Sequence, residues 1–215
     1  MSNWLKSKES HGFQDIQRAF SLMMEDGRHI FDAAANALVG GTDPEAIRED
    51  LFATDRRINQ TEQRIRRMIV VHGTVRGANS FPSLLVMMSL AKDAERIGDY
   101  AKNIFDLAAN SVDLGPPDQR AKLVAIKDEI SRVLGEARDV QEAQDEAAAR
   151  RLLHECDRLE DLCDGYIGLA LEKEGKGSVG FALASRYFKR VTAHAGNVVT
   201  SVVMPLDKLD FFDED

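Results

Sequence analysis

The sequence predicts an all-α protein in which six helices form two tandem three-helix bundles. Apolar residues recur at helical spacing along almost the whole chain of 215 residues. Only five prolines and 7% aromatic residues argue against a β-sandwich or a barrel. Two stretches in the second half of the chain also match two stretches in the first half, as expected for an internal duplication.

Turn-forming residues separate the six helices. Gly40 and Gly41 end the first helix, and Pro44 lies in the first turn of the second, with Thr42 or Asp43 as its N-cap. The other boundaries are marked by Gly73 and Gly77, by Gly115-Pro116-Pro117 and by the glycine-rich stretch 175–180. The expected helices cover about 13–38, 44–71, 80–112, 118–143, 145–172 and 181–209.

The sixth helix contains the run VVTSVV at 198–203, which favours a strand by propensity alone. The duplication favours a helix there, because FKRVTAHAGNV at 188–198 aligns with AERIGDYAKNI at 94–104. The preceding helices align as well, DPEAIREDLFATD at 43–55 with DEAAARRLLHECD at 145–157. The two alignments have offsets of 94 and 102 residues, so a connection is shorter in the second half. We assign the repeats to residues 12–114 and 117–210.

Composition excludes several classes of protein and indicates a cellular location. A net charge of −8 and a pI near 5.2 argue against a nucleic-acid binder. The longest nearly uncharged apolar stretch, 81–91, is about half of the roughly 20 residues that span a bilayer, so no membrane span is expected. The opening MSNWLKSKES lacks the apolar core of a secretion signal, which favours the cytoplasm. In a helix, Cys156 and Cys163 would be about 10 Å apart, too far for a disulfide, and we expect reduced, buried thiols.

A pair of acidic residues in the third helix is the first candidate site. Glu95 and Asp99 are four residues apart and project from one helix face, where like charges repel. Gly98 between them adds a helix cost of about 1 kcal/mol relative to alanine. A bound cation or a close helix crossing that needs glycine would offset these costs. The alternative is a solvated acidic face that pairs with neighbouring lysine and arginine.

The second helix of each repeat carries its own acidic line. Asp55, Asn59 and Glu62 share a face in the first repeat, and Asp157, Asp161 and Asp164 occupy the matching positions of the second. If the second and third helices pack side by side, these lines could face Glu95 and Asp99. Oxygen-rich clusters of this kind suit Mg²⁺, manganese or iron, but rows of acids are also common on helix surfaces.

Enzyme motifs are missing from the sequence. A ferritin-type di-iron oxidase needs Glu-x-x-His pairs, and no histidine in this chain has a glutamate three residues before it. The stretch GTVRG at 73–77 lacks the lysine and hydroxyl of a P-loop. The positive charges of the sequence are concentrated in one basic run, which comprises Arg56, Arg57, Arg64, Arg66, Arg67 and Arg76. This run could attract phosphate groups or an acidic partner. The preferred interpretation is a solvated helix face whose charge is balanced by nearby acids.

Two segments carry a resemblance to a known family. AKDAERIGDYAKNI at 91–104 resembles the signature helix of the PhoU family of bacterial phosphate-uptake regulators, and DRRINQTEQRI at 55–65 resembles the helix before it. The duplication and the chain length are also similar to that family's two-repeat layout. The resemblance covers about residues 12–210 and is more specific in the first repeat.

The resemblance implies a cytoplasmic, non-enzymatic adaptor between a phosphate transporter and a sensor histidine kinase. It also implies a metal-capable site at Glu95 and Asp99, with Asp55 and Glu62 on the facing helix, for iron, zinc, nickel, manganese or Mg²⁺. Peripheral attachment to the inner membrane face and a homodimer are left open. An alternative is a helical accessory protein of another transporter, such as a sodium–phosphate carrier.

The second repeat departs from the family pattern. Lys189 stands at the position of Glu95, and Ala193 at the position of Asp99. Asp157, Asp161, Asp164 and His194 could still bind one ion. We prefer a salt bridge from Lys189 in place of the metal, which predicts at most one good cation site, in the first repeat.

Overall fold

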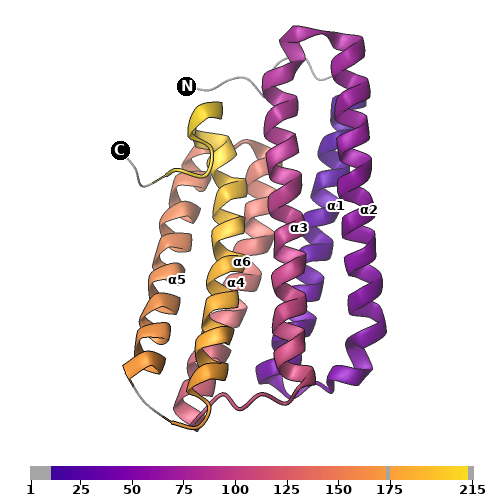
Figure 1. Ribbon diagram of the computed structural model, residues 1–215. Coiled ribbons are helices and arrows are strands. Elements are labelled where there is room, and N and C mark those ends of the chain that lie inside the picture. The colour runs from indigo at the N-terminus through magenta and orange to yellow at the C-terminus, as the bar shows by residue number, and fades with distance from the viewer. Residues whose placement is uncertain (1–10, 173–174, 213–215) are drawn as a thin grey trace.

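The computed structural model describes residues 11–172 and 175–212, and in this part of the chain it contains helices and no strand (Figure 1). The long helices are α1 (His11–Ala35), α2 (Pro44–Arg76), α3 (Phe81–Ala109), α4 (Pro117–Ala143), α5 (Glu146–Glu172) and α6 (Ser178–Val203). One short π-helix, η1 (Asn36–Gly40), and two 3₁₀ helices, η2 (Ala78–Ser80) and η3 (Leu206–Lys208), complete the elements. The predicted all-α class with six helices is confirmed.

The helices pack as two groups of three that share one core. α1, α2 and α3 contact one another, as do α4, α5 and α6, and the groups meet along α3–α6 and α1–α4. Figure 1 shows α2 and α5 at opposite edges, with α3 and α6 side by side between them. The buried apolar side chains form one continuous cluster that draws on all six helices. Burial of this shared core is the main force that holds the repeats together.

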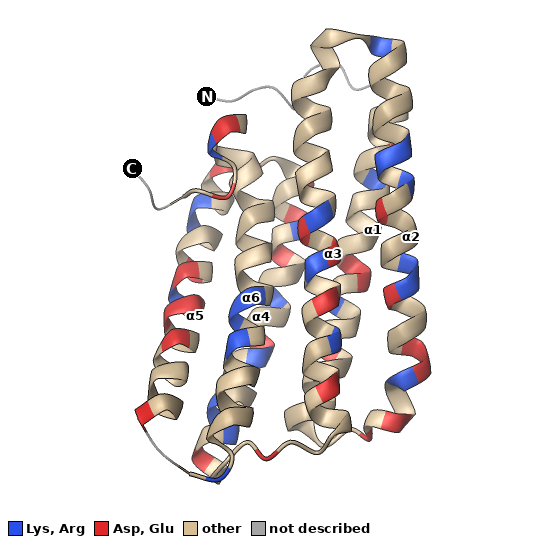
Figure 2. Cartoon of the chain, viewed as in Figure 1, with Lys and Arg blue, Asp and Glu red and all other residues tan. Residues whose placement is uncertain are grey.

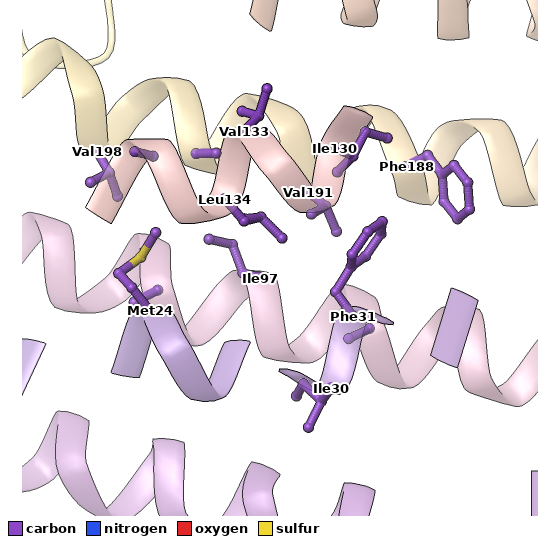
Figure 3. Close-up of a cluster of buried hydrophobic side chains, with 14 of the residues drawn as sticks. Met24, Ile30, Phe31, Ile97, Ile130, Val133, Leu134, Phe188, Val191 and Val198 are labelled. Carbon is purple, nitrogen blue, oxygen red and sulfur yellow. The ribbon is translucent and has the colours of Figure 1, made fainter. Parts of the chain in front are cut away.

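Figure 3 shows the middle of this core, where the two groups meet. Phe31 of α1 and Phe188 of α6 pack edge to face, with ring centroids 5.6 Å apart, and neither is exposed. Ile97 of α3 and Leu134 of α4 lie beside them, fully covered from solvent. Residues of both repeats therefore depend on the same packing.

Several helix boundaries differ from those expected. α2 continues through Gly73 to Arg76, because Phe81 and Leu84 pack closely against that glycine and hold it inside the helix. α3 ends at Ala109, three residues early, since Ser111 adopts a positive φ of 50°. α6 starts at Ser178 and ends at Val203, ahead of Pro205, so the expected extension to residue 209 was wrong.

The valine run at 198–203 lies within α6, as the duplication predicted. Val198, Val199 and Val202 are buried, so tertiary packing outweighs their strand propensity. At the other end of α6, a Cβ on Gly180 would lie 2.1 Å from the carbonyl oxygen of Asp113. Only glycine lets α6 begin against the α3–α4 connection.

Among the described residues, no helix is long and apolar enough to cross a membrane. Cys156 and Cys163 are both free thiols and both buried, as expected. Burial raises the pKa of Cys163 to about 12 and raises that of Cys156 further, so both are protonated at neutral pH. Buried, protonated thiols of this kind are poor nucleophiles.

Candidate functional site

The four acidic residues predicted for the first repeat lie on α2 and α3, two helices that pack together. Asp55 and Glu62 of α2 are buried, and Glu95 and Asp99 of α3 are largely covered. Figure 2 shows acidic and basic residues alternating along this part of both helices. The sequence thus located a charged contact between two helices, with lysine and arginine as part of it.

Lys102 of α3 occupies the position between the two aspartates. Its Nζ lies 2.9 Å from Asp55 Oδ1 and 3.0 Å from Asp99 Oδ1. Burial alone would lower the pKa of Lys102, but the hydrogen bonds to both carboxylates outweigh it and raise the pKa. Asn59 donates a hydrogen bond of 3.4 Å to the other oxygen of Asp55. The ammonium group therefore ties α3 to α2 as a permanent cation.

The two glutamates have basic partners on their own helices. Arg66 approaches Glu62 to 2.6 Å, one helical turn away, and Lys92 approaches Glu95 to the same distance. Arg96 lies between the two acids of α3, 3.4 Å from Asp99. All four acids of the candidate site are therefore neutralised by side chains of this chain.

Lysine ammonium groups lie beside these acids, at positions where a metal ion would bind. No group of three or more His, Cys, Asp or Glu side chains in the described part of the chain is placed to hold a metal ion. A metal at Asp55 and Asp99 would have to displace Lys102, and one at Glu95 would have to displace Lys92. The metal site implied by the family resemblance stays a prediction.

Gly98 lies at a close helix crossing, one of the two explanations that the sequence left open. A Cβ at this position would lie 3.3 Å from Ile58 Cδ1 of α2 and 3.5 Å from Ile30 Cδ1 of α1. Two helices therefore approach α3 on the side next to its charged face. The tight packing offsets the helix cost of the glycine.

In the second repeat, Lys189 forms the predicted salt bridge. It pairs with Asp164 and so links α6 to α5. The four candidate residues of this repeat are not brought together: Asp161 is exposed, and His194 lies in the contact with α3. Both repeats thus place a lysine ammonium against an acid of the neighbouring helix.

Glu160 is an acidic residue of this region that the sequence analysis missed. It occupies the repeat position of Ile58, which is fully buried in the first repeat. The pKa of Glu160 is raised to about 7, chiefly by burial; Lys189 lowers it, and the charges of Asp157 and Asp164 add to the increase. The sequence did contain a signal for Glu160, because the matching position of the first repeat holds the apolar residue Ile58.

Replacing Glu160 with glutamine should stabilise the protein at pH 8 by about 1–2 kcal/mol, a range that allows for solvent screening of a partly exposed carboxyl. The folded state holds the proton more tightly than the unfolded state, in which the pKa is near 4.5. The stability of the wild type therefore falls as pH rises from about 4.5 through 7. The gain in Glu160→Gln should grow over the same range and vanish below it.

Urea denaturation of Glu160→Gln at a series of pH values measures this effect. Asp161→Asn is the matched control, since Asp161 is the exposed neighbour and should change little. A gain of the same size at every pH would contradict the assignment.

A buried polar network joins the two repeats. His194 Nδ1 of α6 lies 2.8 Å from Asp93 Oδ1 of α3, and Asn197 donates a 2.9 Å hydrogen bond to the same oxygen. Both Asp93 and His194 are less than 10% exposed. Asp210, in the C-terminal segment, also faces this pair; burial and the charge of Asp93 raise its pKa to about 6.

The network extends outward through aromatic rings. Tyr100 of α3 stacks on His194, with centroids 5.7 Å apart. Arg190 donates a hydrogen bond of 3.2 Å to the Tyr100 hydroxyl and lies over its ring. The sequence offered one signal for this contact, because Asp93 falls on the apolar face of α3 between Leu90 and Ile97. Its partner lies 101 residues further along the chain.

Comparisons with known proteins find the same domain and the same fold elsewhere. The sequence model of the PhoU domain family matches residues 20–108, most of the first repeat. A crystal structure of PhoU from Pseudomonas aeruginosa is similar, with a TM-score of 0.75 at 18% sequence identity over 89% of this chain and 95% of that chain. At this identity the structural likeness shows the fold alone. A search of curated proteins gave no match. The first repeat of the chain thus matches the PhoU domain, and the whole chain has a fold similar to that of PhoU.

Proposed function

We propose that this protein is a non-enzymatic regulator of phosphate homeostasis, acting in the cytoplasm as an adaptor between a phosphate transporter and a sensor histidine kinase. The observation that carries the proposal is the PhoU domain at residues 20–108. The sequence ERIGD at 95–99 lies inside this domain, and its acids belong to the ion-paired contact of α2 and α3. We propose this contact as the regulatory surface.

The charge of that surface differs from the acidic face that the sequence suggested. The side chain of Arg96 is 48% exposed and that of Lys92 is 42% exposed, whereas Glu95 is 13% exposed. A partner would meet the basic side chains first and the acids beneath them. Binding would exchange internal ion pairs for ion pairs with the partner. Such complementarity determines specificity more than affinity.

The test is a bacterial strain in which this gene is replaced by the Glu95→Ala/Asp99→Ala variant, with a reporter of phosphate-starvation genes. We expect expression in high phosphate to rise toward the level of a deletion strain, because the ion pairs that shape the surface are lost. The matched control is Asp139→Ala/Glu142→Ala, two exposed acids of α4.

Normal repression in the double variant, with protein levels unchanged, would count against the proposed surface. Normal repression in the deletion strain would count against the regulatory function. Altered phosphate uptake without a change in the reporter would favour the alternative, an accessory protein of another phosphate carrier.

Elemental analysis of the same purified variant beside the wild type tests the metal site. Bound iron, zinc, nickel or manganese that disappears in Glu95→Ala/Asp99→Ala would place the metal on this motif. If wild-type protein purified without chelators contains no metal, the ammonium group of Lys102 is the cation that balances Asp55 and Asp99.

A further inference from the structure

The end of the α2–α3 hairpin, residues 63–91, is positively charged in an otherwise acidic protein. This segment, the hairpin tip, contains no Asp or Glu, although the chain has a net charge of −8. Figure 2 shows basic residues and no acidic ones at this end of the hairpin. Arg64, Arg67 and Arg76 are exposed and form no ion pair with the described residues, whereas Arg66 pairs with Glu62. The three arginines are available to an anionic partner.

Apolar side chains are exposed among these arginines. Val70, Val71, Val75, Phe81 and Leu85 are each about half exposed or more, and Val75 reaches 76%. A shallow hollow of about 460 Å³ runs beside Val71 and Val75 toward the start of α1. Exposed apolar groups gathered in this way mark an interaction site.

The shape of the hairpin tip distinguishes between partners. Figure 1 shows that the hairpin extends beyond the ends of the other helices. The offsets between the repeats give this hairpin eight more residues than its counterpart in the second repeat, and most of them lengthen the helices, because α2 ends at Arg76 and α3 starts at Phe81. At about 100° per residue, Val70, Val71 and Val75 spread over about 140° of α2, and Phe81 and Leu85 add positions on α3. A flat protein surface would cover one side of this tip, whereas a bilayer surrounds an inserted tip on every side.

We propose that the hairpin tip binds an anionic lipid bilayer. Its exposed valines, Phe81 and Leu85 enter the interface, and Arg64, Arg67 and Arg76 contact the headgroup phosphates. Apolar burial together with attraction of basic residues to anionic lipid is the usual basis of such peripheral binding. The proposal does not depend on the regulatory function, because it rests on the charge, exposure and shape of the hairpin tip alone.

Co-sedimentation with vesicles tests the proposal on the purified full chain. We expect binding to vesicles of phosphatidylcholine mixed with phosphatidylglycerol, weaker at high salt, and little binding to pure phosphatidylcholine. Arg64→Gln/Arg67→Gln should reduce the partition coefficient about 30-fold, since each arginine near an anionic surface contributes about 5-fold. Val71→Ser/Val75→Ser should reduce it about 10-fold.

Each variant has a matched control elsewhere on the surface. Arg150→Gln/Arg151→Gln removes two exposed arginines of α5, and Leu171→Ser/Val179→Ser removes two exposed apolar side chains near the α5–α6 connection. All of these side chains are exposed, so the fold should be unaffected.

Two outcomes would overturn the proposal. Wild-type protein that stays in the supernatant with both kinds of vesicle would leave the hairpin tip as a surface for a protein partner. Equal losses in the tip variants and their controls would show binding elsewhere on the molecule. Because only purified protein and lipid are used, neither outcome bears on phosphate-regulated gene expression.

Discussion

Replacing His194 with alanine should lower the free energy of unfolding by about 3–5 kcal/mol, the usual cost of removing one partner from a buried hydrogen-bonded pair that contains a carboxyl group. Asp93 would then remain in the α3–α6 contact with Asn197 as its hydrogen-bond donor. The stacking of Tyr100 on the imidazole would be lost as well. Urea denaturation followed by circular dichroism, with linear extrapolation, measures the change.

The chain offers a matched control for this prediction. His29 and Asp50 also form a histidine–carboxylate pair, at 2.6 Å, but both side chains are more than half exposed. His29→Ala should therefore cost less than about 1 kcal/mol. Similar losses in the two variants would show that burial does not set the strength of the Asp93–His194 pair.

A double-mutant cycle separates the pair from the cavity that alanine leaves. Asp93→Ala/His194→Ala removes both partners and should lose less stability than the sum of the single changes. The reason is that neither buried member of the pair is then left without the other. Strictly additive losses would argue against a direct interaction between the two side chains.

Replacing Phe188 with alanine should cost a similar amount, about 3–5 kcal/mol, because it leaves a cavity in a fully buried part of the core. The ring contacts Phe31 of the other repeat, so the cavity would open between α6 and α1. Since the core is continuous, we expect one cooperative transition at a lower denaturant concentration. Scanning calorimetry together with circular dichroism at several wavelengths tests both points.

Phe211→Ala is the control, because Phe211 is 51% exposed and its loss should change stability little. Two separate transitions in Phe188→Ala, one of them at the wild-type midpoint, would contradict the shared core. That result would mean that the first repeat folds independently of its contact with α6.

The sequence did not predict which charged residues of the first repeat pair with one another. Helical spacing placed Glu95, Asp99 and Asp55 on adjacent faces, and their closeness in the fold was predicted on the condition that α2 and α3 pack together. By its spacing, Lys102 is a neighbour that could pair with the acids of its own helix. Its position between Asp55 and Asp99 depends on how the two helices are rotated and shifted, which periodicity does not specify.

The prediction for Lys189 succeeded for a different reason. The repeat alignment places it at the position of Glu95, at the contact with the preceding helix, where Asp164 was already expected. A change from acid to base at such a position predicts an ion pair, and Lys189 pairs with Asp164. Glu160 was missed because the comparison followed the acids of the first repeat and not its buried positions.

The sequence by itself determined the six helices, their chief boundaries and the duplication, because apolar periodicity, glycine and proline act locally along the chain. It also determined the PhoU signature of the first repeat. Only the tertiary structure decided that Asp93 meets His194 and that a lysine lies between Asp55 and Asp99. Those contacts join residues far apart in sequence, and their geometry follows from how whole helices pack around a common core.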